Sequence, residues 1–157
     1  MIETSHLNLV LKTPGELRAM IDGMSPEEKT DLSPDWLARV EAATEPDPWL
    51  HGFTVRLQDG DIPVGNCGYK APPCPEGVVE IAYGIDPDHQ GNGYATEVAR
   101  GMVSYGYSQE EVRLVCAHTL PEVNASTRVL TKCGFIKVGE VIDPDDGLVW
   151  RWEKTKE

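Results

Sequence analysis

An apolar strand, a glycine-containing turn and an amphipathic helix follow one another in the second half of this 157-residue chain. Residues 78–85 are largely apolar, which predicts a central strand of a sheet. Residues 90–93 read Gln-Gly-Asn-Gly, and glycines at such a junction let the backbone turn tightly and expose N–H groups. From Ala95 to Gly106, apolar residues recur at helical spacing. Because a helix N-terminus carries unpaired N–H donors and partial positive charge, the junction predicts a cradle for a pyrophosphate.

Two common phosphate motifs do not fit this junction. A P-loop needs Gly-Lys followed by Ser or Thr, and residues 85–96 contain no lysine. A dinucleotide fingerprint needs three spaced glycines near the start of a doubly wound domain, whereas two glycines occur here, well inside the chain. A glycine-rich helix entry without any ligand is the remaining alternative.

The junction instead matches the signature Q/R-x-x-G-x-G/A of the GNAT acetyltransferases, with Gln90, Gly93 and Ala95 at its three fixed positions. A second block, residues 118–135, reads HTLPEVNASTRVLTKCGF. It resembles the RimJ/RimL-like branch of that family, whose fourth helix typically begins with asparagine and serine and ends in Lys-x-Gly-Phe. The resemblance is close from about Ile62 to the C-terminus and only architectural over the first fifty residues.

The wider pattern agrees with a mixed α/β chain. Thr13, Ser25 and Ser33 each precede a proline, which is a helix-entry signal. Asn124–Lys132 predicts a further helix, closed by Cys133-Gly134. The other predicted strands are Leu7–Leu11, Phe53–Leu57, Ile62–Tyr69, Leu114–Ala117, Phe135–Ile142 and Leu148–Glu153, with a turn at Asp59-Gly60 and an acidic turn at residues 143–147.

The resemblance implies an α/β (α+β) fold of the GNAT type. We expect a mixed, mostly antiparallel central sheet of about seven strands flanked by about four helices. A splayed pair of parallel strands would form the cofactor site. One domain is expected over residues 1–157, with a variable substrate-side strand and helices in 1–50 and a cofactor-binding core in 62–155.

By the same resemblance, strand backbone would bind the pantetheine arm of acetyl-CoA and the amides of the glycine turn would bind its pyrophosphate. The expected cofactor-binding residues are Tyr83, Gly84, Ile85, Gln90, Gly91, Asn92, Gly93, Tyr94, Ala95, Thr96, Asn124 and Ser126. Asn124 departs from many relatives, because it lies two residues before the serine and not three. It either reaches the pantetheine arm or only caps its helix.

Acetyl transfer requires that the amine lose a proton, that the oxyanion be stabilised and that the leaving thiolate be protonated. Glu80 is a lone carboxylate in an otherwise apolar strand, which favours it as the general base. The alternative is a structural carboxylate paired with Arg56 or Arg113. His118, at the end of the next predicted strand, is the second candidate base.

For the proton on the thiolate, the resemblance points to Ser126, whose alternative role is to satisfy backbone donors at the start of its helix. Tyr83 and Tyr94 are weaker candidates, and the ring of Tyr94 is expected to pack. The four cysteines match neither a zinc pattern nor a Cys-x-x-Cys pair, so no metal site is expected. Cys116 and Cys133 are expected in the core.

The formal net charge of −12 disfavours nucleic acid and anionic membranes as partners and favours a cationic acceptor, although acidity can also serve solubility alone. No apolar stretch approaches the roughly 20 residues of a membrane-spanning helix, and no signal peptide is recognised, so a cytoplasmic location is expected. We therefore predict an acetyl-CoA-dependent N-acetyltransferase that acts on a primary amine, a protein N-terminus or a small molecule, by direct attack in a ternary complex. Homodimerisation is left open. The rival is a non-catalytic acyl-CoA-binding or interaction module on the same fold.

Overall fold

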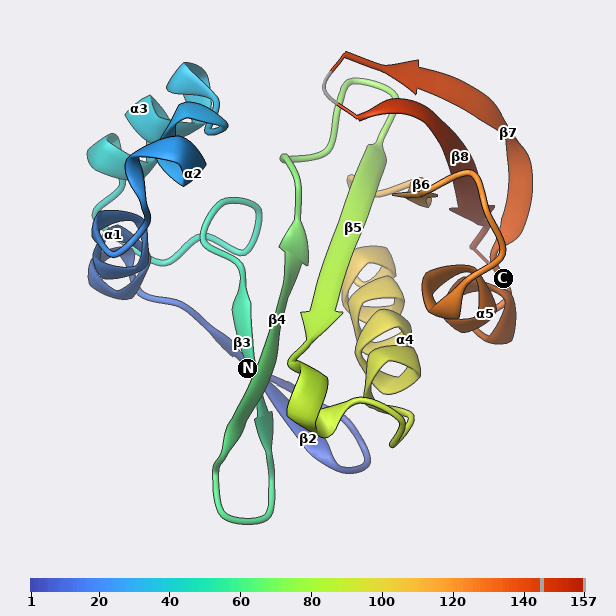
Figure 1. Cartoon of the computed structure of the whole chain (residues 1–157), viewed down its shortest axis with the longest axis horizontal. Coiled ribbons are helices and arrows are strands. Elements are labelled where there is room, and N and C mark those ends of the chain that lie inside the picture. The colour runs from blue at the N-terminus through green and yellow to red at the C-terminus, as the bar shows by residue number, and fades with distance from the viewer. Residues whose placement is uncertain (145, 157) are drawn as a thin grey trace.

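The computed structural model describes residues 1–144 and 146–156, and its strands form one sheet in the order β1-β2-β3-β4-β5-β6-β8-β7 (Figure 1). The strands are β1 Ile2–Glu3, β2 Leu7–Leu11, β3 Phe53–Leu57, β4 Pro63–Tyr69, β5 Val78–Ile85, β6 Leu114–Thr119, β7 Ile136–Asp143 and β8 Gly147–Lys154. The helices are α1 Pro14–Asp22, α2 Pro26–Thr30, α3 Pro34–Ala42, α4 Tyr94–Tyr107 and α5 Ala125–Lys132, with a 3-10 turn, η1, at Pro87–His89. Only β5 and β6 pair in parallel among these strands, so the predicted mixed sheet is confirmed.

The predicted elements differ from the observed ones mainly at their ends. The short strand β1 was not expected, and β6 extends two residues beyond Ala117, to Thr119. The predicted acidic turn between β7 and β8 contains Asp145, which lies outside the described residues.

Capping explains where the first three helices begin. Thr13 and Ser25 each accept a hydrogen bond from the backbone N–H three residues later, and the glutamate there returns a bond to the cap, which completes two capping boxes. Ser33 caps α3 in the same way through the N–H of Trp36. These local signals confirm the helix starts predicted from the sequence. Figure 1 shows α1–α3 grouped together on the opposite side of the molecule from α5.

One face of the central strands packs against α4. The Tyr69 hydroxyl donates a hydrogen bond to the carbonyl oxygen of Met102 at 2.5 Å, which joins β4 to the middle of this helix. The ring of Phe53 lies 6.1 Å from that of Tyr105, and Val98, Ala99 and Met102 are fully buried beneath the sheet. Helix α4 therefore covers the face to which the odd-numbered residues of β3, β4 and β5 point.

The opposite face of β5 is open. Val79 and Ile81 are buried, whereas Ala82 and Gly84 are exposed and Glu80 is partly exposed. The strand is central in the sheet, as predicted, but it is not covered on both sides. Its apolar appearance comes from the face on α4, and the even-numbered residues from Glu80 to Gly84 point to the uncovered side.

Strands β5 and β6 diverge after a short stretch of pairing. Their register contains three pairs, Val78 with Leu114, Val79 with Val115 and Glu80 with Cys116. Beyond that point β5 continues to Ile85 with β4 as its only paired neighbour, and β6 continues to Thr119 beside β8. The expected splayed strand pair is therefore present, with Glu80 at the closed end of the gap.

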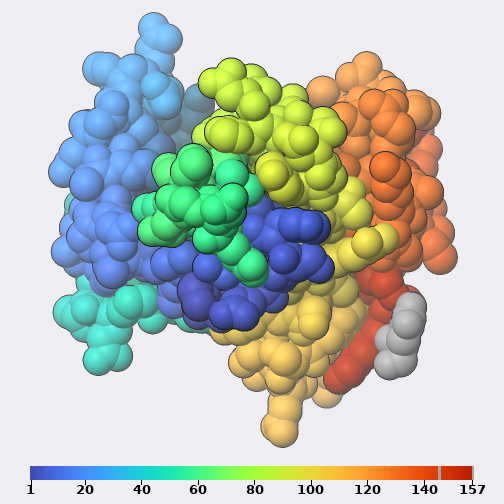
Figure 2. All heavy atoms as spheres, turned by 90° about the horizontal axis from the view of Figure 1, so that it is seen from below, coloured from blue at the N-terminus to red at the C-terminus, as the bar shows by residue number. Residues whose placement is uncertain are grey.

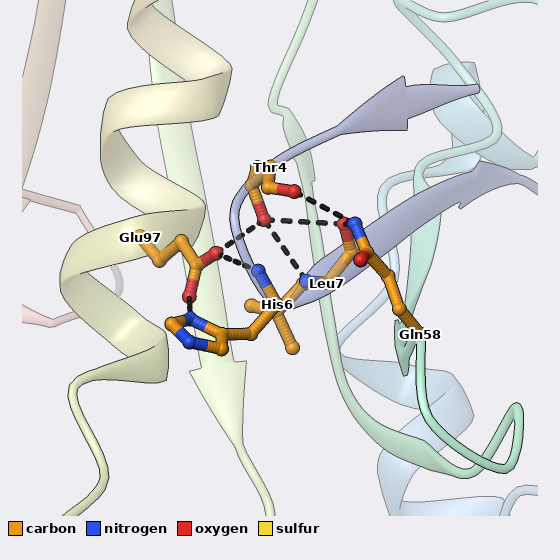
Figure 3. A network of polar contacts seen from close by, with 5 residues as sticks. All are labelled: Thr4, His6, Leu7, Gln58 and Glu97. Atoms are coloured by element: carbon orange, nitrogen blue, oxygen red, sulfur yellow. Dashed lines mark hydrogen bonds and ion pairs between the residues drawn. The ribbon is translucent and has the colours of Figure 1, made fainter.

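The first turn of α4 is tied to the N-terminal strands by Glu97 (Figure 3). Its Oε1 accepts hydrogen bonds from the Thr4 hydroxyl at 2.7 Å and from the His6 N–H at 2.5 Å, and its Oε2 lies 3.3 Å from His6 Nδ1. Gln58 supports the same turn by donating to the Thr4 carbonyl oxygen at 2.7 Å. Although burial raises the pKa of Glu97, the bonds from Thr4 and His6 outweigh it, so the pKa lies below the ordinary value of 4.5.

This network leads to a prediction for stability against pH. A carboxyl group whose pKa is lowered by folding stabilises the protein above the unfolded pKa, and the stabilisation is lost as pH falls through the folded pKa. We expect Glu97→Gln to lower the free energy of unfolding by about 1 kcal/mol at pH 7, the scale of such bonds. The difference from the parent should shrink below pH 4.5, toward the lowered pKa of Glu97.

Urea unfolding of both proteins between pH 3 and 7 measures this difference. Glu41→Gln, on the exposed surface of α3, is the matched control and should leave stability unchanged. A difference between Glu97→Gln and the parent that stays constant over the whole pH range would contradict the assignment.

Candidate functional site

A cavity of about 450 Å³ lies between the turn after β5 and helix α5. Figure 2 shows that turn, in yellow-green, beside the orange residues that surround α5. The cavity is lined by Gly84, Ile85, His89, Gln90, Gly91, Gly93, Tyr94, Ala95, Thr96, Ala125, Ser126, Arg128, Val129 and Lys132. The two sequence blocks singled out above therefore meet at one site, at the open end of the gap between β5 and β6.

The glycines of the turn adopt a conformation that other residues rarely take. Gly91 and Gly93 have φ angles of +83° and +81°, and Gly93 forms the N-cap of α4. A Cβ atom added to either glycine would meet no atom within 4 Å, so the space in front of the turn is free. Side chains hold the turn in shape: Gln90 Nε2 donates to the Ile85 carbonyl oxygen at 2.9 Å, and Asn92 Nδ2 donates to that of His89 at 3.1 Å. A rigid turn with free space above a helix N-terminus suits a phosphate group.

Two cations on α5 face this turn and were not predicted. Arg128 and Lys132 are one helical turn apart and both line the cavity, opposite the glycines. Arg100 of α4 donates a hydrogen bond to the Lys132 carbonyl oxygen at 3.1 Å, which fixes the end of α5 against α4. The spacing of Arg128 and Lys132 is the signal in the sequence, but only the packing of α5 on α4 shows which way they point.

The two polar residues at the start of α5 have different surroundings. Asn124 is the N-cap: its Oδ1 accepts a hydrogen bond from the Thr127 N–H at 3.0 Å, and the Thr127 hydroxyl accepts one from the Asn124 N–H at 2.9 Å. Ser126 is exposed and lines the cavity. Of the two roles considered for Asn124, its contacts favour capping, whereas Ser126 lies where a bound ligand would pass.

The two tyrosines near the cavity are packed residues. Tyr83 points to the α4 face and packs on the core, and burial, followed by the nearby Cys133 thiol, raises its pKa above the ordinary value of 10.0. Tyr94 lines the cavity with part of its surface and packs on the core with the rest, as expected. Three residues of β5 were expected to bind the pantetheine arm through their backbone. Gly84 and Ile85 line the cavity, whereas Tyr83 lies one residue nearer the closed end of the gap.

Glu80 and His118, the two candidate bases, are in direct contact at the closed end of the gap. Glu80 Oε2 lies 3.0 Å from His118 Nδ1 and 2.8 Å from Lys70 Nζ. Both contacts are within ion-pair distance, although neither has the angle of a hydrogen bond, and Oε2 itself is buried. If Nδ1 carries the ring proton toward the carboxylate, Nε2 of the neutral ring is an acceptor.

The partners of Glu80 are not the arginines of the alternative considered above, in which it pairs with Arg56 or Arg113. Arg56 instead contacts Asp61, at 3.8 Å. Lys70 directly follows the last residue of β4, and its backbone N–H donates to the Glu80 carbonyl oxygen at 2.9 Å. The contact between Lys70 and Glu80 was not predicted, because no local sequence pattern reveals which residue of a neighbouring chain segment will lie opposite Glu80.

The cysteines do not form a reactive centre. Cys116 is buried, and burial above all raises its pKa to about 11, so it stays a thiol at neutral pH. Cys133 is half-buried beside α4, where its thiol contacts the Thr96 carbonyl oxygen at 3.6 Å. Within residues 1–144 and 146–156, no group of three potential metal ligands comes together, and no helix is long and apolar enough to cross a membrane.

Comparison with known proteins identifies the family. The family model for the acetyltransferase (GNAT) domain matches residues 10–136, and the chain belongs to this family. It is 27% identical over 104 residues to the uncharacterized N-acetyltransferase p20 of Bacillus licheniformis, covering 66% of this chain and 54% of the relative. It is 38% identical over 85 residues to the uncharacterized N-acetyltransferase YoaA of Bacillus subtilis, covering 54% and 48%. The chain thus spans about half the length of these relatives.

Solved structures share the fold at low sequence identity. A GNAT acetyltransferase from Bacillus anthracis superposes with a TM-score of 0.69 at 20% identity, covering 98% of this chain and 97% of the other. A dodecameric spermidine N-acetyltransferase from Vibrio cholerae gives 0.71 at 20% identity, covering 96% and 94%. The aminoglycoside acetyltransferase AAC(6')-Ib, in complex with coenzyme A and kanamycin, gives 0.66 at 18% identity, covering 96% and 95%. The family model and these superpositions agree on the fold of the acetyltransferase (GNAT) domain.

The cradle can be tested through Gly93. We expect Gly93→Asp to weaken acetyl-CoA binding about ten-fold or more, because the new carboxylate projects into the free space before the turn, and a ten-fold loss needs only about 1.4 kcal/mol. Isothermal titration calorimetry measures the affinity. Gly93→Asn has the same size without the charge and tolerates a positive φ, so it should bind better than Gly93→Asp.

Gly60→Asp is the control for backbone strain, because Gly60 has the same φ of +81° in the distant β3–β4 turn. Its affinity for acetyl-CoA should equal that of the parent. Equal affinity of the parent and of Gly93→Asp for acetyl-CoA would rule out the cradle. Neither NADH nor ATP should bind to the parent in place of acetyl-CoA.

Proposed function

We propose that this protein transfers the acetyl group of acetyl-CoA to a primary amine of a small cationic molecule, by direct attack in a ternary complex. The observation that carries the proposal is the gap between β5 and β6, which leads from the glycine turn at its open end to the Glu80–His118 pair at its closed end. A binding module would need the turn and the cavity, but it would not need a carboxylate–imidazole pair on the open face of the sheet.

The residues around the cavity fit acetyl-CoA. The free space at Gly91 and Gly93 and the N-terminus of α4 would hold the pyrophosphate, together with Arg128 and Lys132. The edge of β5 from Ile81 to Ile85, which has no strand partner on the β6 side, would bind the amide groups of the pantetheine arm. When bound, acetyl-CoA supplies the activated acetyl group as a thioester.

Glu80 is proposed as the general base, with His118 as the residue that positions it. A base must lie within about 2.6–3.2 Å of the atom whose proton it accepts, so the acceptor nitrogen would sit beside Glu80 on the open face. His118 holds the carboxylate there by its contact at 3.0 Å. The other arrangement, in which Glu80 orients His118 and Nε2 takes the proton, follows the logic of a carboxylate–histidine pair and is separated from the first by mutation.

Three observations favour a small cationic acceptor over a protein N-terminus. The chain carries a formal charge of −12, which attracts cations. One structural neighbour is named for acetylating spermidine, and another is an aminoglycoside acetyltransferase; both substrates are polyamines. The carboxylate at the closed end of the gap would also bind an ammonium group as a counterion.

The remaining assignments rest on sequence pattern and surface. The start and end of α5 support placement in the RimJ/RimL-like branch, and we infer a cytoplasmic location and one domain over residues 1–157 with the division stated above. A homodimer is supported by β7, which forms an edge of the sheet and carries exposed apolar side chains, including Ile136 and Ile142 at 68% and 73% exposure.

Mutation of the pair tests the base. We expect Glu80→Gln to lower kcat/KM by roughly 10²-fold or more at neutral pH, the usual scale for loss of a general base. The loss should shrink at high pH, because a free amine needs no base. A coupled assay of thiol release from acetyl-CoA, with polyamines and N-terminal peptides as acceptors, measures the rates. Glu153→Gln, another ion-paired carboxylate of the same sheet, is the matched control.

His118→Gln and the double variant decide between the two arrangements. A smaller loss for His118→Gln than for Glu80→Gln supports Glu80 as the base. A loss confined to His118→Gln would move the role of base to the imidazole. Full activity of Glu80→Gln at neutral pH would remove the carboxylate from the mechanism altogether.

Ser126 is proposed to protonate the leaving thiolate. We expect Ser126→Ala to lower kcat while changing the affinity for acetyl-CoA only modestly, since the hydroxyl would act mainly in the transition state. Steady-state kinetics and calorimetry on the same preparation separate the two effects. Ser104→Ala, at an exposed position of α4, serves as the control. Unchanged turnover would return Ser126 to a role at the start of α5.

A further inference from the structure

Lys70 brings a primary amine of the chain itself to the proposed base. Its Nζ lies 2.8 Å from Glu80 Oε2, inside the range of about 2.6–3.2 Å that a base needs to accept a proton. The backbone bond from the Lys70 N–H to the Glu80 carbonyl oxygen, at 2.9 Å, fixes the two residues opposite each other. Lys70 is the only lysine that contacts Glu80 among the ion pairs of residues 1–144 and 146–156.

The amine also lies on the side of the sheet from which an acceptor would approach. Glu80, Ala82 and Gly84 point to the open face, and the Lys70 side chain, 54% exposed, reaches Glu80 from just beyond the end of β4. An acceptor nitrogen that gives its proton to Glu80 Oε2 would occupy the position that Lys70 Nζ now holds. Such a substrate would have to displace Lys70, whereas Lys70 itself already stands where an acceptor is needed.

We infer that Lys70 is an internal acetyl acceptor, an inference that rests on the proposed function. In this step Lys70 Nζ loses a proton to Glu80 and attacks the thioester carbonyl carbon. A C–N bond forms and the C–S bond breaks. As the amide forms, the nitrogen loses its second proton, which the leaving thiolate takes up to become coenzyme A, while the first proton stays on Glu80 until it is released to solvent. The products are Nε-acetyl-lysine at position 70 and free coenzyme A, so no oxidant or further reactant is needed.

Acetylation of Lys70 changes the charge of the site. The amide has no positive charge, so the ion pair with Glu80 is lost and the carboxylate becomes available to an external ammonium group. The modified protein would then bind a cationic acceptor more tightly than the unmodified one. The first turnover of the enzyme on itself would in this way prepare the site for its substrate.

Mass spectrometry tests the modification. The purified chain, incubated with acetyl-CoA, should gain about 42 Da, the mass of one acetyl group in place of hydrogen, and peptide mapping should place it on Lys70. Lys29, on the exposed surface of α2, reports spontaneous acetylation in the same sample. The rate at Lys70 should far exceed that at Lys29, be independent of protein concentration, and fall in Glu80→Gln and in Gly93→Asp. Lys70→Arg should leave only the slow background.

A second measurement needs no acetyl-CoA. Calorimetric titration with spermidine should give several-fold tighter binding to Lys70→Gln, which lacks the charge as acetyl-lysine does, than to the parent, while Lys70→Arg should resemble the parent. Equal affinity in all three proteins would show that Lys70 does not compete for the acceptor position, and would overturn the inference.

The outcomes also separate this inference from the proposed function. If external amines are acetylated while Lys70 reacts no faster than Lys29, Lys70 is a structural partner of Glu80 and only the inference fails. If the rate at Lys70 rises with protein concentration, the acceptor is another molecule and the internal reaction is excluded. If acetyl-CoA binds neither the parent nor its variants, both the proposed function and the inference fail.

Discussion

The site depends on the early end of the pairing between β5 and β6. Two neighbouring parallel strands normally share backbone hydrogen bonds along their length, and exposed unpaired N–H and C=O groups invite another partner. Here the pairing stops at Glu80 and Cys116, while β5 runs on for five residues. The middle of the sheet thereby contains an unpaired strand edge, along the β6 side of β5. Helices α4 and α5 lie around that edge and do not cover it (Figure 1).

The same strand directs its core residues and the proposed general base to opposite faces of the sheet. Val79 and Ile81 belong to the core on α4, and Glu80 between them belongs to the open face. Alternate residues of one strand thus serve the core and the proposed chemistry, and both fit the regular backbone geometry of a strand. The helix on the buried side begins at Tyr94, directly after its N-cap Gly93, so the core is connected to the turn that is proposed to hold the pyrophosphate.

Local chemistry was readable from the sequence, and long-range contacts were not. The capping residues Thr13 and Ser25 predicted where two helices begin, and the glycines at positions 91 and 93 predicted a tight turn with positive φ angles, where the phosphate cradle is proposed. The contacts of Glu80 with His118 and Lys70 were out of reach, because strand register joins residues that are ten or more positions apart. The direction of Arg128 and Lys132 depended in the same way on how α5 packs against α4.

The alternation along β5 also constrains how such a protein can change during evolution. Insertion or deletion of a single residue within Val78–Ile85 would turn the carboxylate of Glu80 toward α4 and an isoleucine toward the open face. The same length change in the exposed loop between Tyr69 and Val78 would be absorbed without altering either face. Related chains are therefore free to differ in length around this strand, while the strand itself can drift in composition but not in register.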